Sequence, residues 1–187
     1  IVAMQSAEGE EVKFSKKVNP VDYNNAVEHW LAAVENAMCE AVRDHIKRAK
    51  DTYTEETRTA FLQEWPGQVV IAVCSLEWTS RSEYELLNNG YHGLDGYRLT
   101  CEKQLGDIVK LVRRNDLSPV VRCTLEALIV IEVHAKDVLV SLVNKKVDSP
   151  QSFDWQAQLR YYWTDNNLFV CATNATLPYG YEYLGNT

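Results

Sequence analysis

The sequence predicts a mainly helical fold: a helical bundle that follows an N-terminal β-hairpin and precedes a short C-terminal β segment. Apolar residues recur at three-and-four spacing over long stretches, most clearly in residues 27–53 and 119–143. Glycine and proline signals separate these stretches. From residue 151 onward the chain changes character and becomes dense in aromatic side chains, which need a large partner surface.

Composition limits the class of protein. The chain has 187 residues, of which 46% are hydrophobic and 24% charged, as in a globular domain with a sizeable core. Its net charge of −7 argues against a nucleic-acid or anionic-membrane surface, because both need a basic footprint. No apolar run approaches the roughly 18 residues of a membrane span. We therefore expect neither nucleic acid nor a membrane as a partner.

The five cysteines predict reduced thiols. They lie far apart in the sequence, at positions 39, 74, 101, 123 and 171. This spacing forms neither a zinc knuckle nor a small secreted disulfide framework, so a cytosolic compartment is favoured.

The first eighteen residues predict a β-hairpin. Strands at residues 1–4 and 12–14 flank residues 6–10, where Gly9 can supply the positive φ of a tight connection. An isolated two-stranded ribbon is marginal in water, so the hairpin should lie on something else. A docking hairpin and a decorative flap both fit the sequence.

The clearest helix runs from Asn25 to about Tyr53. Asn25 as N-cap, with Glu28 three residues later, forms a capping-box pattern. One apolar stripe follows, and we expect it to face the core. Its members are Val27, Trp30, Leu31, Val34, Met38, Val42, Ile46, Ala49 and Tyr53.

Further helices are expected downstream. A short one spans residues 55–64 and ends at Pro66-Gly67. The apolar run at residues 68–87 fits a buried strand or a buried helix, and propensity alone favours a strand at its start. A loop at residues 88–96 then precedes a helix at residues 97–112. Ser118-Pro119 begins the next helix, which should be central because apolar residues around 128–131 cover more than one face.

The aromatic C-terminal part is expected to begin with a helix capped by Ser152, with Trp155, Leu159 and Tyr162 on one face. A turn at residues 164–167, a strand at 168–173 and an extended or irregular tail from Pro178 should follow. Arg160 could stack on Tyr161 or Trp163, or pair with a carboxylate of a neighbouring module.

A search for catalytic motifs is negative. The sequence contains no GxxxxGK[ST] phosphate loop, no histidine pair at metal-ligand spacing and no serine with the flanking glycines of a hydrolase elbow. We therefore assign no catalytic residue, metal ligand or bound cofactor within this chain.

Several motifs in order resemble one family. The segment FDWQAQLRYYW (153–163), preceded by ALIVIEVHAKDVL (127–139) and followed by YGYEYLGN (179–186), closely resembles dynein heavy chains where the linker ends and the first AAA+ module begins. Upstream, SAEGEEVKF (6–14), VEHWLAAVENAM (27–38) and WPGQVVIAV (65–73) resemble the linker of the same family. The resemblance covers essentially the whole chain. The motif RYYW (160–163), with no large insertion, is typical of axonemal members.

The resemblance implies an architecture and a role. Residues 1–150 would be the C-terminal part of the linker, a helical lever over the AAA+ ring, and residues 151–187 the junction and first strands of the first module. It also implies a helix at residues 68–87. The parent chain would be a motor ATPase moving toward the microtubule minus end, with ATP and Mg bound outside this segment. Implied partners are the rest of the heavy chain with its ring, the microtubule through the parent chain, and other dynein arm subunits. The implied location is the cytoplasm and cytoskeleton, in the axoneme of a cilium or flagellum.

Two sets of residues acquire implied roles from this family. The linker–ring junction would be formed by Phe153, Trp155, Arg160, Tyr161 and Trp163. Only the end of the tail could approach the adenine pocket, namely Leu184, Gly185 and Asn186. The phosphate loop, acidic metal ligand and arginine finger of the family lie further along the heavy chain.

An alternative function remains open from the residues alone. A free-standing acidic helical module could bind another protein through exposed aromatics. The chain starts without Met and stops after a turn signal, so we expect a piece of something larger. If the native chain continues into a Gly-rich phosphate loop, the motor function is favoured over the free-standing module.

Overall fold

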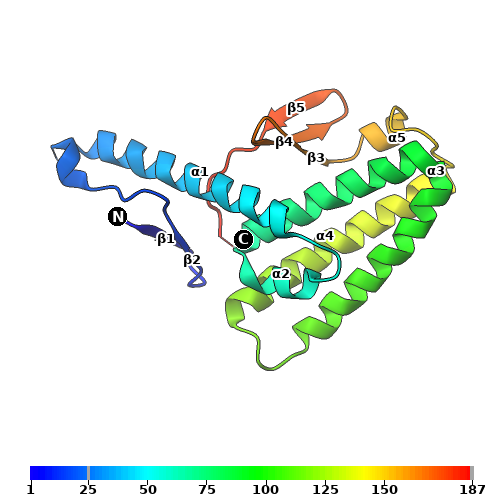
Figure 1. Ribbon diagram of the computed structural model, residues 1–187, viewed down its shortest axis with the longest axis horizontal. Coiled ribbons are helices and arrows are strands. Elements are labelled where there is room, and N and C mark those ends of the chain that lie inside the picture. Colours follow the sequence, from blue (N-terminus) through cyan, green and yellow to red (C-terminus); the bar gives the residue numbers. More distant parts are fainter. Residues whose placement is uncertain (25, 186–187) are drawn as a thin grey trace. The chain divides into compact units, whose positions relative to one another are not determined.

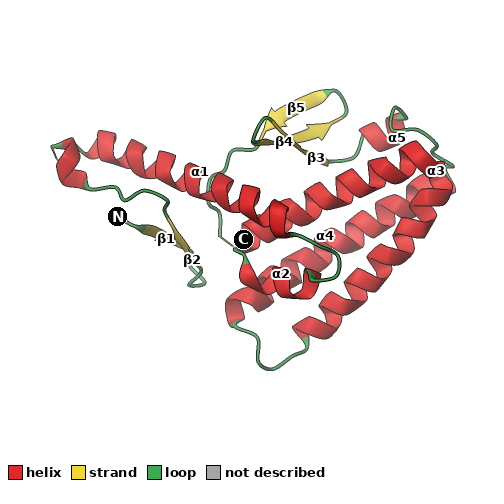
Figure 2. Ribbon diagram, viewed as in Figure 1, coloured by secondary structure: helices red, strands yellow, loops and turns green. Residues whose placement is uncertain are grey.

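The computed structural model describes residues 1–24 and 26–185. Figures 1 and 2 show helices with a two-stranded and a three-stranded sheet, as the sequence predicted. The chain forms two compact units. The first unit comprises residues 1–70 with the tail from Gly180, and the second unit comprises Ile71–Tyr179.

The N-terminal hairpin is confirmed in the first unit. Strands β1 (Ala3–Gln5) and β2 (Glu11–Lys13) pair antiparallel, with Met4 opposite Val12. Gly9 has φ +91° in the connection, a conformation that glycine adopts without steric cost. Val12 and Val18 are buried. The hairpin therefore contributes apolar side chains to the core of its unit.

A 3-10 helix η1 (Pro20–Tyr23) leads to helix α1 (Val27–Thr52), with Ala26 at its N-cap position. The expected cap, Asn25, lies outside the described residues. The fully buried residues of α1 begin near the middle of the helix, and they are Ala37, Ala41, Val42, Ile46 and Ala49. The expected stripe is wrong at the N-terminal end of α1, where Val27 is 57% and Leu31 49% exposed. Periodicity identifies the apolar face of a helix but not the length over which other elements cover it.

Helix α2 (Arg58–Glu64) confirms the short helix, although residues 55–57 form a turn rather than its first residues. Phe61 and Leu62 are buried. The ring of Phe61 meets Tyr53 edge to face, with centroids 5.1 Å apart.

Helix α3 (Gly67–Val112) replaces both the ambiguous run and the expected loop. The helix at 68–87 is confirmed, but the loop at 88–96 is wrong. The backbone leaves helical geometry at Gly90 (φ 58°, ψ −147°). Asp148 Oδ1 accepts a hydrogen bond from Tyr91 N at 3.2 Å, which satisfies an unpaired donor where the helix restarts. Gly90 therefore allows the backbone of α3 to reverse direction, as Figure 1 shows, and the Asp148 carboxylate caps the part of the helix that follows.

Helix α4 (Pro119–Asn144) begins as predicted, with Ser118 Oγ accepting from Val121 N at 3.2 Å. Gly90 divides α3 into two arms, residues 67–89 and 91–112. The buried face of α4 packs with both arms in the core of the second unit. That core contains Leu86, Leu94, Tyr97, Cys101, Val138, Leu139, Leu142, Val147 and Trp155. The expected central position holds for one face of the helix only, since Leu128 is fully buried whereas Val130 is 70% exposed.

The C-terminal part contains less helix than expected. Helix α5 (Phe153–Gln156) is one turn long. The following residues form an antiparallel sheet of β3 (Arg160–Thr164), β4 (Asn167–Ala172) and β5 (Ala175–Pro178), in the order β3-β4-β5. The expected helix through Tyr162 is wrong because aromatic residues also suit strands. Asp165 and Asn166, at φ 51° and 59°, form a two-residue turn that pairs β3 with β4 and confirms the predicted turn and strand.

All five cysteines are free thiols. Among the described residues, no helix combines the length and apolar character needed to cross a membrane.

Leu128→Ala should lower the free energy of unfolding by about 2–5 kcal/mol, because it leaves a cavity at a fully buried position. Val130→Ala on the same helix is the matched control and should change it by less than about 0.5 kcal/mol. Urea unfolding of the two variants measures both values. Equal effects would contradict the assigned packing of α4.

Candidate functional site: an aromatic junction held by Glu83

Trp155 attaches the aromatic segment to the core of the second unit. Its side chain is fully buried, and its ring lies 5.5 Å from that of Trp78 on α3, with the planes inclined at 40°. The indole Nε1 donates to Glu83 Oε1 at 3.1 Å. A buried indole is thereby both packed and hydrogen-bonded, as its polar N–H requires.

Glu83 also binds the first strand of the sheet. The same oxygen, Oε1, accepts a hydrogen bond from the Tyr162 hydroxyl at 2.5 Å. Thr79, one turn earlier on α3, accepts from the backbone N–H of Tyr161 at 3.0 Å. Residues four apart share one face of a helix, so Thr79 and Glu83 form a polar strip on which α5 and β3 are held.

Arg160 strengthens this attachment from within the sheet. It is 8% exposed and donates from Nη1 to the Tyr162 hydroxyl and from Nη2 to Thr173 O, both at 3.2 Å. Its guanidinium carbon lies 5.8 Å from the centre of the Tyr162 ring. The stacking expected on Tyr161 or Trp163 falls instead on Tyr162, because residues two apart lie on the same face of a strand.

Burial keeps the two tyrosines of the junction protonated. It raises the pKa of Tyr161 and, more strongly, that of Tyr162, whose hydrogen bond to Glu83 raises the pKa further. Tyr162 is therefore a neutral donor at neutral pH. Its carboxylate partner makes the bond charge-assisted, and such bonds are stronger than those between neutral groups.

The structure divides the predicted junction residues into two groups. Trp155, Arg160 and Tyr161 contact groups of the second unit through the bonds above. Phe153 is 73% exposed, and Trp163 is half-buried opposite Leu168 in the sheet. The first group fixes the segment, whereas Phe153 presents an aromatic ring to the surroundings.

The residues expected near an adenine pocket lie in the tail of the first unit. Leu184 is 67% exposed and its backbone N–H donates to Gln68 Oε1 at 3.0 Å. Gly185 is buried with φ +70°. Asn186 lies outside the described residues.

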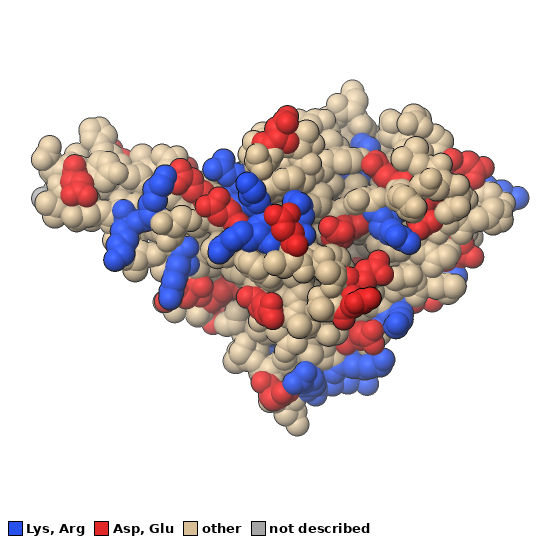
Figure 3. Space-filling model, viewed as in Figure 1, with Lys and Arg blue, Asp and Glu red and all other residues tan. Residues whose placement is uncertain are grey.

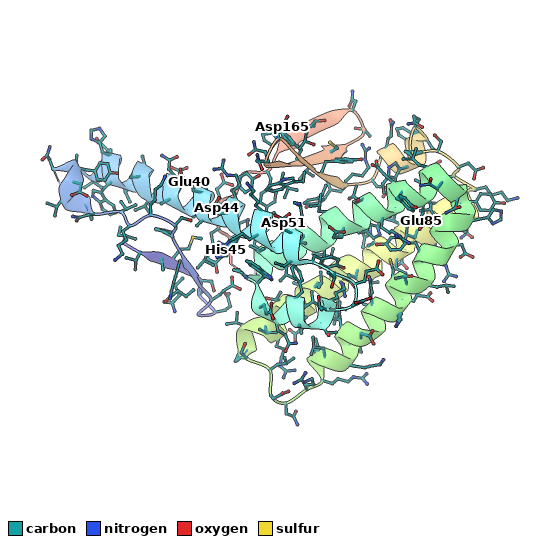
Figure 4. The ribbon with its side chains drawn as sticks, viewed as in Figure 1. Glu40, Asp44, His45, Asp51, Glu85 and Asp165 are labelled. Atoms are coloured by element: carbon teal, nitrogen blue, oxygen red, sulfur yellow. The ribbon has the colours of Figure 1, made fainter. Side chains whose placement is uncertain are left out.

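Other polar features of the described chain are its acidic side chains and one cavity. Within residues 1–24 and 26–185, no three His, Cys, Asp or Glu side chains are grouped as metal ligands. A cavity of about 450 Å³ is lined by α3 residues that include Glu85, labelled in Figure 4, but Glu85 pairs with Arg81 at 2.9 Å and Asn89 at 2.9 Å. Acidic and basic side chains are interspersed on the face shown in Figure 3.

Sequence reasoning missed Trp78, Thr79 and Glu83. A signal was present, since Thr79, Glu83 and Leu86 follow three-and-four spacing and so place two polar side chains on a core-facing stripe. Such polar residues need partners when buried, which marks the stripe as an attachment surface.

Tyr162→Phe should lower the free energy of unfolding by about 1–3 kcal/mol at neutral pH, since it removes a charge-assisted hydrogen bond. A raised pKa in the folded state gives stability that is fully present below the ordinary tyrosine pKa of about 10 and is lost as pH rises above it. The difference between the variant and the wild type should therefore shrink in alkaline solution. Denaturant unfolding at several pH values measures it.

Tyr84→Phe is the matched control, because Tyr84 follows Glu83 on α3 and is 56% exposed. It should leave both stability and its pH dependence unchanged. A Tyr162→Phe deficit that is constant across the alkaline range would contradict the assigned role of the hydroxyl.

Comparison with known proteins agrees with the family resemblance drawn from the sequence motifs. The family model described as "Dynein heavy chain, N-terminal region 2" matches residues 1–49. Over all 187 residues, the chain is 42% identical to dynein axonemal heavy chain 12 of Mus musculus, of which it covers 6%. It is 46% identical to dynein axonemal heavy chain 1 and 40% identical to dynein axonemal heavy chain 3 of Homo sapiens, and covers 4% of each. The chain thus spans a small part of the length of these relatives, and it aligns with them over all of its own residues. The resemblance drawn from the sequence motifs is confirmed, and the chain belongs to the dynein heavy chain family.

Proposed function

We propose that this chain is the C-terminal part of the linker of an axonemal dynein heavy chain, together with its junction to the first AAA+ module. It would act as the mechanical lever of an ATP-driven, minus-end-directed microtubule motor. The observation that supports this role best is the attachment of the aromatic segment to α3 by Glu83 and Thr79. A lever needs a firm connection at the point where force enters.

The physical argument concerns stiffness. Close-packed helical layers resist deformation better than loops do. The second unit joins both arms of α3, helix α4 and Trp155 in one buried cluster. A force applied to the three-stranded sheet would reach α3 through the Trp155 and Tyr162 bonds to Glu83 rather than through a flexible connection.

The functional boundary remains a prediction. We assign residues 1–150 to the linker and residues 151–187 to the junction and the start of the module. The compact units divide the chain differently, because the tail from Gly180 returns to the first unit. A boundary defined by function can lie within a compact unit, since continuous packing across the junction is what a lever requires.

ATP and Mg would bind in the parent chain outside this segment, which has no phosphate loop of its own. Leu184 and Gly185 would come nearest to the nucleotide. The partners in this proposal are the rest of the heavy chain with its AAA+ ring, the microtubule through the parent chain, and other dynein arm subunits. The location is the axoneme of a cilium or flagellum.

A free-standing interaction module is the second candidate, favoured by the exposed side chains of Phe153 and Leu159, at 73% and 57%. Mass measurement and sequencing of the native polypeptide distinguish the two. A much longer chain with a phosphate loop downstream supports the lever. A native chain near 21.4 kDa would support the module.

Phe153→Ala in the full heavy chain should reduce ATP-driven microtubule gliding while leaving this segment folded. An aromatic anchor in a well-packed contact costs about 2 kcal/mol or more when truncated. Trp155 is a poorer probe, because its removal from the core should cost about 3–5 kcal/mol of stability. Val130→Ala, which also truncates an exposed apolar side chain, is the control and should glide like the wild type. Unchanged velocity in Phe153→Ala would count against Phe153 as a ring contact.

A further inference from the structure

Gln68, the second residue of α3, is bonded to the backbone of the tail. It is 9% exposed, its Nε2 donates to Glu182 O at 2.8 Å, and its Oε1 accepts from Leu184 N at 3.0 Å. A carboxamide that donates to and accepts from the same extended backbone imitates a neighbouring strand. It therefore fixes the position of residues 182–184 along their own direction.

Glu10 holds the same tail from the hairpin. Its carboxylate is buried, with Oε1 accepting from Gly67 N at 2.8 Å and Oε2 accepting from the Tyr183 hydroxyl at 2.5 Å. Gly67 begins α3, where unpaired N–H groups and the helix dipole favour a carboxylate. Burial and the bond to Glu10 raise the pKa of Tyr183, so its hydroxyl remains a donor at neutral pH.

The end of the tail also lies against the hairpin turn. At Gly185, with φ +70°, a Cβ atom would lie 2.9 Å from Ser6 Cβ. Only glycine accommodates this approach together with this backbone conformation. Of the two readings open from the sequence, the docking hairpin is the one that these contacts support.

We propose that Gln68 and Glu10 form a tail clamp, a pair of positioning residues that couples the position of residues 183–185 to the first turn of α3. The clamp's coupling to nucleotide rests on the proposed function, in which Leu184 and Gly185 approach the nucleotide. Both residues of the clamp converge on the same turn, since Glu10 binds Gly67 N and Gln68 is the next residue. A shift of the tail must therefore break these bonds or move the start of α3.

The test compares three variants of the full heavy chain: Gln68→Ala, Gln68→Glu and the control Gln63→Ala. Gln63 lies on α2 and donates to Thr59 O at 2.7 Å, so its truncation also removes a side-chain hydrogen bond, away from the tail. Hydrogen exchange of the peptide 180–185 reports the clamp. Steady-state ATP hydrolysis reports the coupling.

Gln68→Ala should speed exchange at Leu184 and raise the KM for ATP by about two- to tenfold, the effect of losing an ordinary hydrogen bond, with a smaller change in kcat. Gln68→Glu places an acceptor oxygen against Glu182 O, where the amide donated, so it should speed exchange at least as much as Gln68→Ala does. Gln63→Ala should match the wild type in both measurements.

Unchanged tail exchange in Gln68→Ala overturns the clamp. Faster exchange with unchanged KM and kcat overturns its positioning role. If the wild-type chain does not hydrolyse ATP, the proposed function fails, and the exchange comparison still decides the clamp. If Gln68→Ala also loses protection throughout α1, Glu10→Gln, which conserves side-chain shape, replaces it with the same expected results.

Discussion

The second unit depends on one carboxylate oxygen. Oε1 of Glu83 accepts hydrogen bonds from Trp155 and Tyr162, so one atom of α3 joins both the one-turn helix and the first strand of the sheet. Two donors compensate the hydration that this half-buried carboxylate loses. The apolar part of the same attachment is the contact of Trp155 with Trp78 and the core cluster. Packing fixes where the aromatic segment lies, and the hydrogen bonds fix its orientation.

The first unit is closed by a comparable arrangement with different chemistry. Residues from both ends of the chain meet there, because Glu10 of the hairpin binds Tyr183 of the tail. Bringing ends so distant in sequence together carries an entropic cost that rises slowly with loop length. Here two carboxylate bonds and two carboxamide bonds, all ending at the first turn of α3 or on the tail, offset that cost. Each unit therefore relies on buried polar groups whose partners come from distant parts of the sequence.

That reliance explains how much of the structure could be predicted. Local signals identified the hairpin turn at Gly9, the start of α4 at Ser118 and the turn before Leu168, because each depends on neighbouring residues. The helix expected through Tyr162 failed because aromatic residues suit strands as well as helices, and the pairing with β4 decided between them. Of the junction residues, Trp155 was foreseeable from its aromatic character. Glu83 was not singled out, since its role comes from partners more than seventy positions away.

The reversal of α3 at Gly90 bears on how the second unit folds. The two arms of α3 are joined by a single non-helical residue, so Leu86 and Leu94, both in the core, are close in sequence as well as in space. Contacts between residues close in sequence lose little chain entropy on closure, and proteins rich in them fold quickly. The arms of α3 can thus associate soon after they become helical. They then offer a partly formed apolar surface to α4 and Trp155, which arrive later along the chain.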